Sequence, residues 1–446
     1  MAASTWAKAL ELRPPKIEWQ RKQTGKNAMP IRLAMLGGKP VRTKPFTSWP
    51  QFGNAEEVRL LRTLRSGKWG RLQGHEVAKF EKRFAAAHGC KHGVAVVNGT
   101  VSLRIGLLAA GLRAEDEVII PSYTFFSTAS AVVEANLVPV LVDIDLDTFN
   151  LSPKAVEAAI TPRTRGLIPV HFAGQPADMD AFMAIARKRR LFVMEDAAHA
   201  HGAIYRRRPV GSLGNLASFS FQSSKNLTAG EGGILTTNDD KLAAGCRSIQ
   251  NCGRVPDGLW YEHHVMSGNY RLGEFQGAVL NCQLARLETQ TNRRDANGRY
   301  LASRLTRLPG LHPQKRPPSC TRHSYHLFML RLDGEAFGAP RAAVLKALQA
   351  EGIPCSAGYG FSLHEQPFFR NKAFGPFLPN VSASLDYTKT DCPNSDLICR
   401  EQGVWFEQRL LLGTRSDMDD IAAAFEKIYE NRKALGPRSR KDRQHA

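Results

Sequence analysis

The chain has 446 residues, of which 43% are hydrophobic and 23% are charged. These fractions are ordinary for a globular protein and exclude wholesale disorder, and a chain this long builds a core without a disulfide or metal staple. Its formal net charge is +20, from 61 Lys and Arg against 41 Asp and Glu. No finger, basic-zipper or RNA-recognition pattern accompanies that charge, so we expect no specific nucleic-acid partner.

The cysteines and the chain ends indicate in which cellular compartment the protein is expected. The eight cysteines are scattered without a C-x-x-C pair, which argues against a structural zinc site and a disulfide framework. No run of 18 apolar residues occurs, so we expect no membrane span, and the start lacks the apolar block of a secretory signal. An amphipathic targeting peptide is the alternative there, although Glu11 and Glu18 oppose it. We expect a cytoplasmic protein without a metal, with a poorly ordered basic extension over 1–32 and a basic tail over 434–446.

From about residue 94 to residue 237 the sequence repeats one pattern, a short apolar run followed by a turn and a stretch with helical spacing. The alternation predicts βαβ units, and hence an α/β fold with a mostly parallel sheet covered by helices on both faces. Ligands of such sheets bind beyond the carboxyl ends of the strands, so the turns after these runs are the places to search. The runs are 94–97, 117–121, 138–144, 166–170, 191–194, 217–221 and 232–236.

After Gly268 the pattern changes. Residues 274–294 carry apolar side chains at helical spacing and predict one long helix. The remainder predicts a helix, a strand over 325–332, two further helices and an irregular aromatic loop over 368–390. We therefore expect a large ligand-binding domain over 33–285 and a smaller C-terminal α+β domain over 286–433.

The strongest local signal is the stretch SFQSSKNLTAGEGG, from Ser220 to Gly233. Lys225 stands there between an apolar strand and a glycine-rich turn, and paired glycines let a backbone approach a ligand closely. Ser220 adds a hydroxyl that can contact an anion. Most lysines are solvated surface residues, so it is the neighbours of Lys225 that favour a functional role.

Three further strand ends carry polar or aromatic residues. Asp196 follows the run 191–194 and either caps the next helix or holds a heteroaromatic nitrogen protonated. The turn Asn98-Gly99-Thr100 offers backbone N–H groups and a helix dipole to a phosphate. The pair Phe125-Phe126 either belongs to the core or stacks on a flat ring. With Lys225, these features match the needs of pyridoxal 5′-phosphate: a Schiff-base lysine, an acid for the ring nitrogen, a phosphate site and a flat wall.

With these motifs the sequence resembles the DegT/DnrJ/EryC1/StrS family, the fold-type-I pyridoxal-phosphate aminotransferases that act on sugars and cyclitols. The resemblance runs from about Leu33 to the C-terminal helix and implies the fold-type-I architecture. The matching stretches are 98–100, 115–121 with 124–125, 169–171, 174–180, 195–203, 219–233 and 268–271.

The resemblance also implies a role for each matching residue. Lys225 corresponds to the catalytic Schiff-base lysine and Asp196 to the partner of the pyridine nitrogen. Asn269 corresponds to a residue that reaches the phosphate in the other subunit, which implies a homodimer with shared active sites. The remaining implied cofactor contacts are Gly99, Thr100 and Ser220 at the phosphate, Phe125 against the ring and His199 at the ring hydroxyl.

The implied activity is ping-pong transfer of an amino group from glutamine or glutamate to a keto-cyclitol or ketosugar. The lead-in 33–42, Trp49-Pro50 and the stretch 356–359 resemble the branch of inosose aminotransferases and aminohydroxybenzoate synthases, which favours a keto-cyclitol. The basic charge of the chain favours an anionic nucleotide sugar instead. A third interpretation is a regulatory protein of this fold that keeps the cofactor pocket without turnover.

Overall fold

The computed structural model describes residues 32–435. The expectations for the basic extension, the targeting peptide and the basic tail fall outside these residues, apart from the few next to each boundary. The division into domains at residue 285 stays a proposal, and the two cores below are described as the structure has them.

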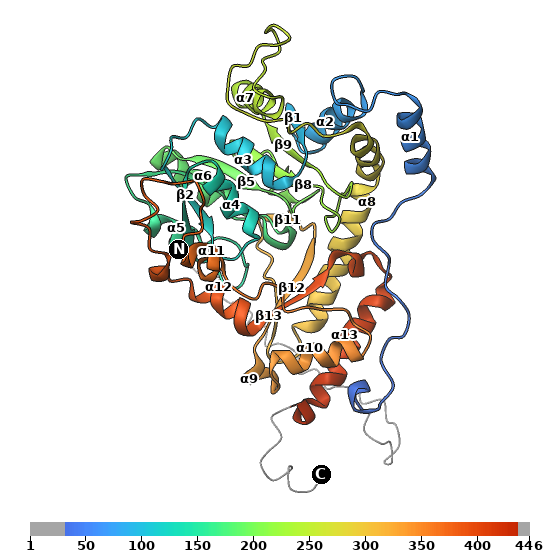
Figure 1. Ribbon diagram of the computed structural model, residues 1–446. Helices are drawn as coiled ribbons and strands as arrows, with labels where there is room; N and C mark the ends of the chain where they lie inside the picture. The colour runs from blue at the N-terminus through green and yellow to red at the C-terminus, as the bar shows by residue number, and fades with distance from the viewer. Residues whose placement is uncertain (1–31, 436–446) are drawn as a thin grey trace, which may run out of the picture.

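A seven-stranded sheet forms the first unit, with the strand order β1-β9-β8-β5-β4-β2-β3 (Figure 1). Strands β8, β5, β4, β2 and β3 run parallel, while β9 pairs antiparallel with both β1 and β8. Each strand overlaps one of the seven apolar runs, so the predicted mostly parallel α/β sheet is confirmed. The strands are β1 (His92–Val96), β2 (Glu117–Pro121), β3 (Val138–Val142), β4 (Thr164–Leu167), β5 (Phe192–Asp196), β8 (Leu216–Ser220) and β9 (Gly233–Thr237).

Helices cover both faces of this sheet because successive strand residues point to opposite sides. Val118 and Ile120 pack in one core with α3, α4 and α7, whereas Ile119 packs in another with α2, α5, α6 and part of α8. The helices are α2 (Glu76–Ala87), α3 (Gly99–Ala109), α4 (Phe126–Glu134), α5 (Pro153–Ala159), α6 (Met179–Arg189) and α7 (Asp240–Gln250), preceded by α1 (Asn54–Arg65).

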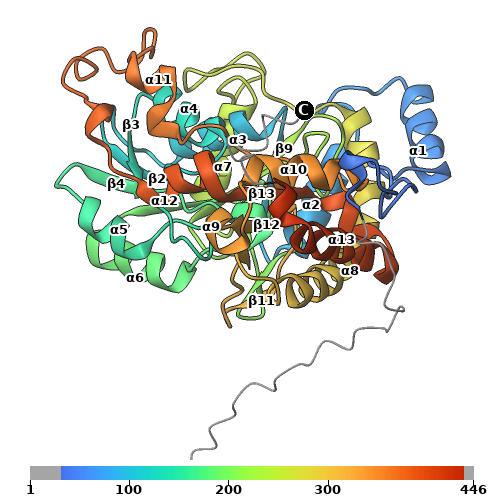
Figure 2. The same ribbon diagram turned by 90° about the horizontal axis from the view of Figure 1, so that it is seen from below.

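The second unit is built on a three-stranded antiparallel sheet of β10 (Leu311–Pro313), β12 (Leu327–Leu332) and β13 (Gly403–Glu407). Helices α10 (Arg341–Ala350) and α13 (Arg415–Glu430) pack against it, as Figure 2 shows from below. The short helix α9 (Gly334–Phe337) follows β12, and β6 (Ile204–Tyr205), β7 (Arg208–Pro209) and β11 (Cys320–Arg322) form a small third sheet. The smaller α+β arrangement confirms the expectation for this part of the chain.

One helix joins the two units. Helix α8 runs from Glu274 to Leu305, so the helix expected over 274–294 and the one expected after it are continuous. Leu280 and Leu287 belong to the core of the first unit, while Leu301 and Leu305 belong to that of the second. The sequence between the two expected helices contains no proline, and therefore nothing in it interrupts the helical hydrogen bonds.

Two irregular segments pack side chains into the cores of the two units. The segment before α1 packs Leu33 and Phe46 into the core of the second unit and runs along its side, drawn in blue in Figure 1. The segment 361–402 contains only short helices, among them α11 (Pro367–Arg370) and α12 (Pro393–Leu397). Its Phe369 and Tyr387 pack over the sheet, and most of the expected loop over 368–390 is indeed irregular.

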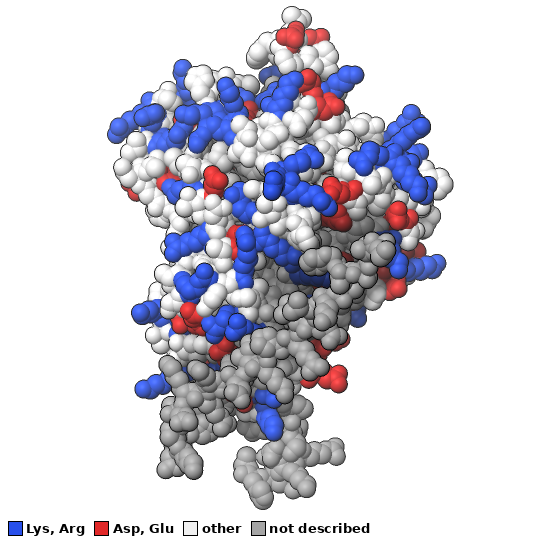
Figure 3. Space-filling view, turned by 180° about the vertical axis from the view of Figure 1, so that it is seen from behind, with Lys and Arg blue, Asp and Glu red and all other residues white. Residues whose placement is uncertain are grey.

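On the face seen from behind, basic side chains outnumber acidic ones (Figure 3). Figure 3 shows Lys and Arg spread over much of the rear face, with fewer Asp and Glu among them. Within residues 32–435, no helix combines the length and the apolar character that crossing a bilayer requires.

Candidate active site

A cavity of about 1020 Å³ lies beyond the carboxyl ends of the sheet strands, where the two units meet. The turns after β1, β2, β5 and β8 line it from the first unit, and residues of β12 and β13 line it from the second. Seven of the eight residues predicted from the sequence line this cavity: Gly99, Thr100, Phe125, Asp196, His199, Ser220 and Lys225.

Lys225 lies half-buried in the turn after β8. Burial lowers the pKa of its amine from 10.5 to about 8, although the charge of Asp196 opposes this shift. The turn is fixed on both sides of the lysine, because the Trp49 indole donates to the Ser223 carbonyl (2.9 Å) and the Asn226 amide donates to the Ser324 carbonyl (2.7 Å). A large fraction of the amine is therefore neutral near pH 8, as a nucleophile or general base requires.

Asp196 ends β5 with a buried carboxylate. Thr128 Oγ1 donates to Oδ2 (2.8 Å) and the Ala198 amide donates to Oδ1 (3.2 Å). Burial raises the pKa of this carboxyl despite these donors and the charge of Lys225. No helix follows Asp196 in the turn 197–202, so it is not a helix cap there. A buried acid that lines a cavity is placed to stabilise a cationic group bound beside it.

The amino-terminal end of α3 gathers hydroxyl groups. Asn98 Oδ1 caps the helix by accepting from the Val101 amide (2.9 Å), and Thr100 Oγ1 lies 2.6 Å from Ser127 Oγ. A Cβ atom on Gly99 would meet Ser220 Cβ at 2.7 Å, so only glycine lets this turn approach the end of β8. The free backbone N–H groups of a helix start, next to these hydroxyls, form a site for a phosphate-like anion.

The rings of Phe125 and His199 face the same space. Phe125 is 58% exposed although it is apolar, so it lines the cavity and does not belong to the core. The centroid of the His199 ring lies 4.2 Å from that of His326, with the rings tilted by 33°, and His199 Nδ1 accepts from the Ala173 amide (3.3 Å). Burial, with the charge of Lys225, lowers the pKa of His199 well below its usual range. The imidazole is therefore neutral at pH 7, with its proton on Nε2.

The sequence profile of the DegT/DnrJ/EryC1/StrS aminotransferase family matches residues 51–402. The chain belongs to this family. This chain is accordingly an aminotransferase, and Lys225, Asp196 and the helix start at Gly99 line one cavity of its fold.

Relatives of known name support this membership. A putative L-glutamine:3-amino-2,3-dideoxy-scyllo-inosose aminotransferase of Streptoalloteichus tenebrarius is 40% identical over 416 residues, covering 91% of this chain and 100% of the relative. The L-glutamine:2-deoxy-scyllo-inosose aminotransferase of the same organism is 39% identical, covering 90% of this chain and 99% of the relative. The crystal structure of 3-amino-5-hydroxybenzoic acid synthase superposes with a TM-score of 0.79 at 36% identity, covering 88% of this chain and all of that one.

Asn269, the eighth predicted residue, lies elsewhere. Asn269 is exposed, and it is not among the residues that line the cavity of its own chain. The preceding stretch 252–267 has turns but neither helix nor strand, and it exposes large apolar side chains such as Trp260 (80%) and Met266 (96%). The single chain thus leaves Asn269 without a role at its own site.

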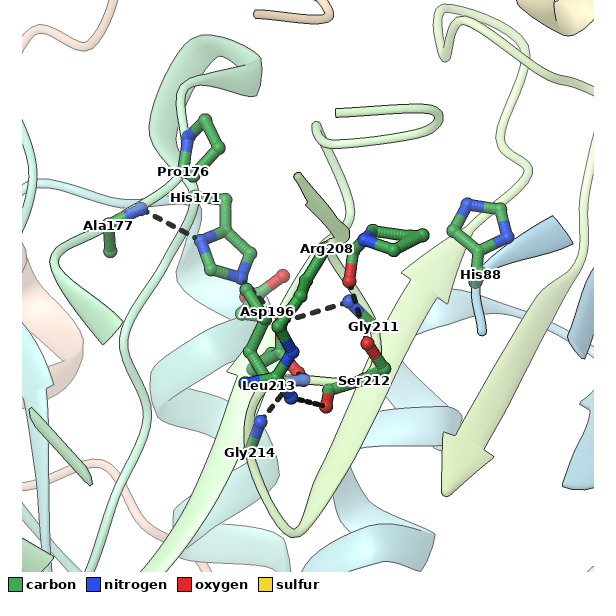
Figure 4. A network of polar contacts seen from close by, with 12 residues as sticks. His88, His171, Pro176, Ala177, Asp196, Arg208, Gly211, Ser212, Leu213 and Gly214 are labelled. Carbon is green, nitrogen blue, oxygen red and sulfur yellow. Dashed lines mark hydrogen bonds and ion pairs between the residues drawn. The ribbon is translucent and has the colours of Figure 1, made fainter. Parts of the chain in front are cut away.

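Glu195, the neighbour of Asp196, is committed to the other side of the sheet. Its carboxylate accepts from the amides of Gly211, Leu213 and Gly214 and from His171 Nε2 (3.0 Å); Figure 4 shows these donors together. Burial alone would raise the pKa of Glu195, but the His171 hydrogen bond and the backbone donors lower it overall. Glu195 therefore anchors the turn before β8 and does not face the cavity.

Several lining residues escaped prediction from the sequence. Ser127 sits on α4 beside Thr100, and the His326 ring contacts that of His199. Trp49, Gln408 and Arg409 come from segments far from the sheet in sequence. The start of the helix that follows β2 was the available signal for Ser127, whereas no local pattern distinguishes the others.

One cluster outside the cavity has the residue types of a metal site. His364, Glu365 and Asp396 each place a ligand atom within 4.8 Å of the others. Glu365 is already ion-paired with Arg370 and Arg400, which supply the positive charge that a cation would bring.

Proposed function

We propose that the chain is a pyridoxal-phosphate-dependent aminotransferase that moves an amino group from glutamine or glutamate to a keto-cyclitol. The observation that carries the proposal is the shared cavity of Lys225, whose pKa is lowered to about 8, and the buried acid Asp196. The relatives named above supply the expected donor and acceptor, since two of them carry the names of L-glutamine:inosose aminotransferases.

The lining residues fit this cofactor. A protonated ring nitrogen beside Asp196 would favour the ionised carboxylate that burial now opposes. Because Gly99 lies close to Ser220, the start of α3 and three hydroxyl groups are available to the phosphate. The hydroxyl groups are those of Ser220, Thr100 and Ser127.

Two aromatic residues would position the ring. Phe125 would stack on its face, and the proton on His199 Nε2 would be donated to the ring hydroxyl. When bound, pyridoxal phosphate supplies an electron-accepting ring that stabilises negative charge on the substrate carbon.

The chain itself then handles protons. Lys225 Nζ, neutral in a large fraction of molecules near pH 8, would take the proton from the donor's Cα and deliver it to the cofactor carbon that receives the amino group. Asp196 keeps the ring nitrogen protonated throughout. With the keto acceptor, Lys225 and Asp196 would play the same roles and the proton would move in the opposite direction, which gives ping-pong kinetics.

A cyclitol acceptor is favoured over a nucleotide sugar. Among the described residues that line the cavity, Lys225 and Arg409 are the cationic side chains, beside the acidic Asp196, Glu231 and Glu407. A nucleoside diphosphate carries at least two negative charges, and of these lining residues Arg409 alone is left to balance them once Lys225 is assigned to proton transfer. The nucleotide sugar remains the second candidate because the chain as a whole is basic.

We further propose a homodimer with shared active sites, acting in the cytoplasm. The exposed apolar loop 252–267 supports the dimer, because contiguous exposed apolar side chains mark protein interfaces. Asn269 follows this loop and would reach the phosphate of the partner's cofactor. The eight cysteines are all free, which supports a reducing compartment.

The proposal is tested with purified protein loaded with pyridoxal phosphate. We expect L-glutamine to change the visible absorbance of the bound cofactor, and 2-deoxy-scyllo-inosose to restore it while yielding the aminated cyclitol by mass spectrometry. A nucleotide-linked ketosugar serves as the comparison acceptor. Bound cofactor without any response to glutamine or glutamate would contradict the proposal and favour a regulatory protein.

A further inference from the structure

The cavity contains one cationic side chain that the proposed chemistry does not use. Of the two cationic residues among its described lining, Lys225 is assigned to proton transfer, which leaves Arg409. The histidines add no charge, because burial lowers the pKa of both His199 and His326 well below the usual range. Arg409 is therefore the fixed positive charge available to a substrate anion.

Arg409 is held weakly. Its Nε lies 2.7 Å from Glu407 Oε2, and its Nη1 reaches the Thr47 carbonyl only at 3.5 Å. The Arg409 side chain is 28% exposed and that of Glu407 is 67% exposed. Exposed ion pairs contribute little because water competes for both partners. The guanidinium can therefore exchange Glu407 for another carboxylate at small cost.

The adjacent Gln408 presents a hydrogen-bond donor to the same cavity. Arg294 donates to its Oε1 through both Nε (2.9 Å) and Nη2 (2.6 Å). Because a guanidinium has donors only, it fixes which end of the amide is the oxygen. The Gln408 side chain lines the cavity, so its free NH₂ group is the end left for a ligand.

Arg294 is itself unusual. It is fully buried, burial lowers its pKa to about 9, and within residues 32–435 no carboxylate forms an ion pair with it. It lies 5.3 Å from the ring of Trp49, which lines the cavity. Its uncompensated charge stands behind the cavity wall and raises the local potential for an anion.

We propose that Arg409 and Gln408, the latter oriented by Arg294, bind the α-carboxylate of the amino donor. The inference rests on the proposed function, in which the donor is an amino acid and the acceptor an uncharged polyol. A carboxylate accepts hydrogen bonds only and takes a guanidinium and an amide NH₂ together. When the neutral acceptor occupies the cavity, Glu407 takes the guanidinium back, so one cavity serves both substrates.

Two variants separate the roles of these side chains. Gln408→Glu keeps an oxygen for Arg294 but replaces the donor with a negative charge, and Arg409→Gln removes the guanidinium. Arg370→Gln is the matched control, because Arg370 is an exposed arginine paired with a carboxylate outside the cavity lining. Glutaramate, which is glutamine without its amino group, is the binding probe, measured by calorimetry on the cofactor-loaded protein.

We expect both variants to weaken glutaramate binding by about 10- to 100-fold, the range for losing a charge-assisted hydrogen bond. The half-saturating glutamine concentration of the first half-reaction should rise in parallel. The half-saturating concentration of 2-deoxy-scyllo-inosose in the second half-reaction, and all values for Arg370→Gln, should stay within about twofold of wild type.

Unchanged glutaramate affinity in both variants, with wild-type melting temperatures, would overturn the assignment of the subsite. Equal losses for glutamine and for the cyclitol would also overturn it, because they would show general damage to the cavity. A wild-type protein that binds glutaramate but takes no amino group from glutamine would overturn the proposed function while leaving a carboxylate site.

Discussion

The carboxylates of Glu195 and Asp196, neighbours in β5, serve opposite faces of the sheet. Glu195 accepts four hydrogen bonds from His171 and the turn before β8, and the pKa of its carboxyl is lowered. Asp196 lines the cavity, and burial raises its pKa. The strand pleat therefore separates a structural acid from the acid assigned to the cofactor, although the two are adjacent in sequence.

We expect Asp196→Asn to lower turnover by at least about 100-fold, because the amide keeps the size of the side chain but cannot hold the ring nitrogen protonated. The cofactor should still bind through its phosphate. Rates of both half-reactions and cofactor content give the measurement, and Asp180→Asn on α6, exposed and paired with Arg206, is the control. A near-wild-type rate for Asp196→Asn would show that another acid serves the ring.

Lys225→Ala should reduce turnover to background while the protein keeps its fold, because the remaining lysines of the described chain do not line the cavity. Loss of turnover is measured with glutamine and the cyclitol, and the fold by circular dichroism and melting temperature. Lys241→Ala on α7 is the matched change at an exposed lysine and should leave turnover intact. Full activity of the Lys225→Ala protein would refute the assignment.

The lowered pKa of Lys225 predicts how stability depends on pH in the cofactor-free protein. Between about 8, its pKa in the fold, and 10.5, its ordinary value, the unfolded chain binds more protons at this residue. The free energy of unfolding therefore rises with pH across this window, and Lys225 contributes no slope below it. The free energies of unfolding of wild type and Lys225→Met, measured with urea, should converge as the pH rises from 8 to 10, since only the wild type carries the buried amine.

Lys188→Met on α6, an exposed position, is the control for this measurement and should stay parallel to wild type at every pH. Parallel curves for Lys225→Met would mean that the Lys225 amine keeps its ordinary pKa in the folded protein.

Shared sites predict that two inactive subunits restore activity when mixed. One carries Lys225→Ala and the other Asn269→Ala with Arg271→Ala. In a mixed dimer one site has both lesions and the other has neither, so each mixed dimer should regain up to half of the wild-type activity. The control chain carries all three changes, and mixing it with Lys225→Ala should restore nothing. Absence of recovery despite demonstrated subunit exchange would count against Asn269 acting on the partner's site.

Local sequence patterns predicted much of the first unit. Apolar runs mark all seven strands of the sheet, and a glycine-rich turn after a strand marks Lys225. The position of Asp196 at a strand end and the turn at Gly99 likewise follow from neighbours within a few residues. These features are readable because strands, turns and helix starts depend on adjacent residues and on the period-two alternation of burial.

Only the tertiary structure decided which residues form the far wall of the cavity. It also decided that β9 runs antiparallel to β1 and β8. Trp49, His326 and the pair Gln408-Arg409 meet there from three segments that are remote from one another in sequence, and nothing near them in sequence marks them as partners. The burial of Arg294 could not be predicted from the sequence either. No residue near it in α8 indicates that Gln408 and Trp49 will contact it. The sequence by itself determined which residues lie at the ends of the strands. Packing between remote segments determined which residues of the second unit face those strand ends, because burial and electrostatic environment depend on the whole fold.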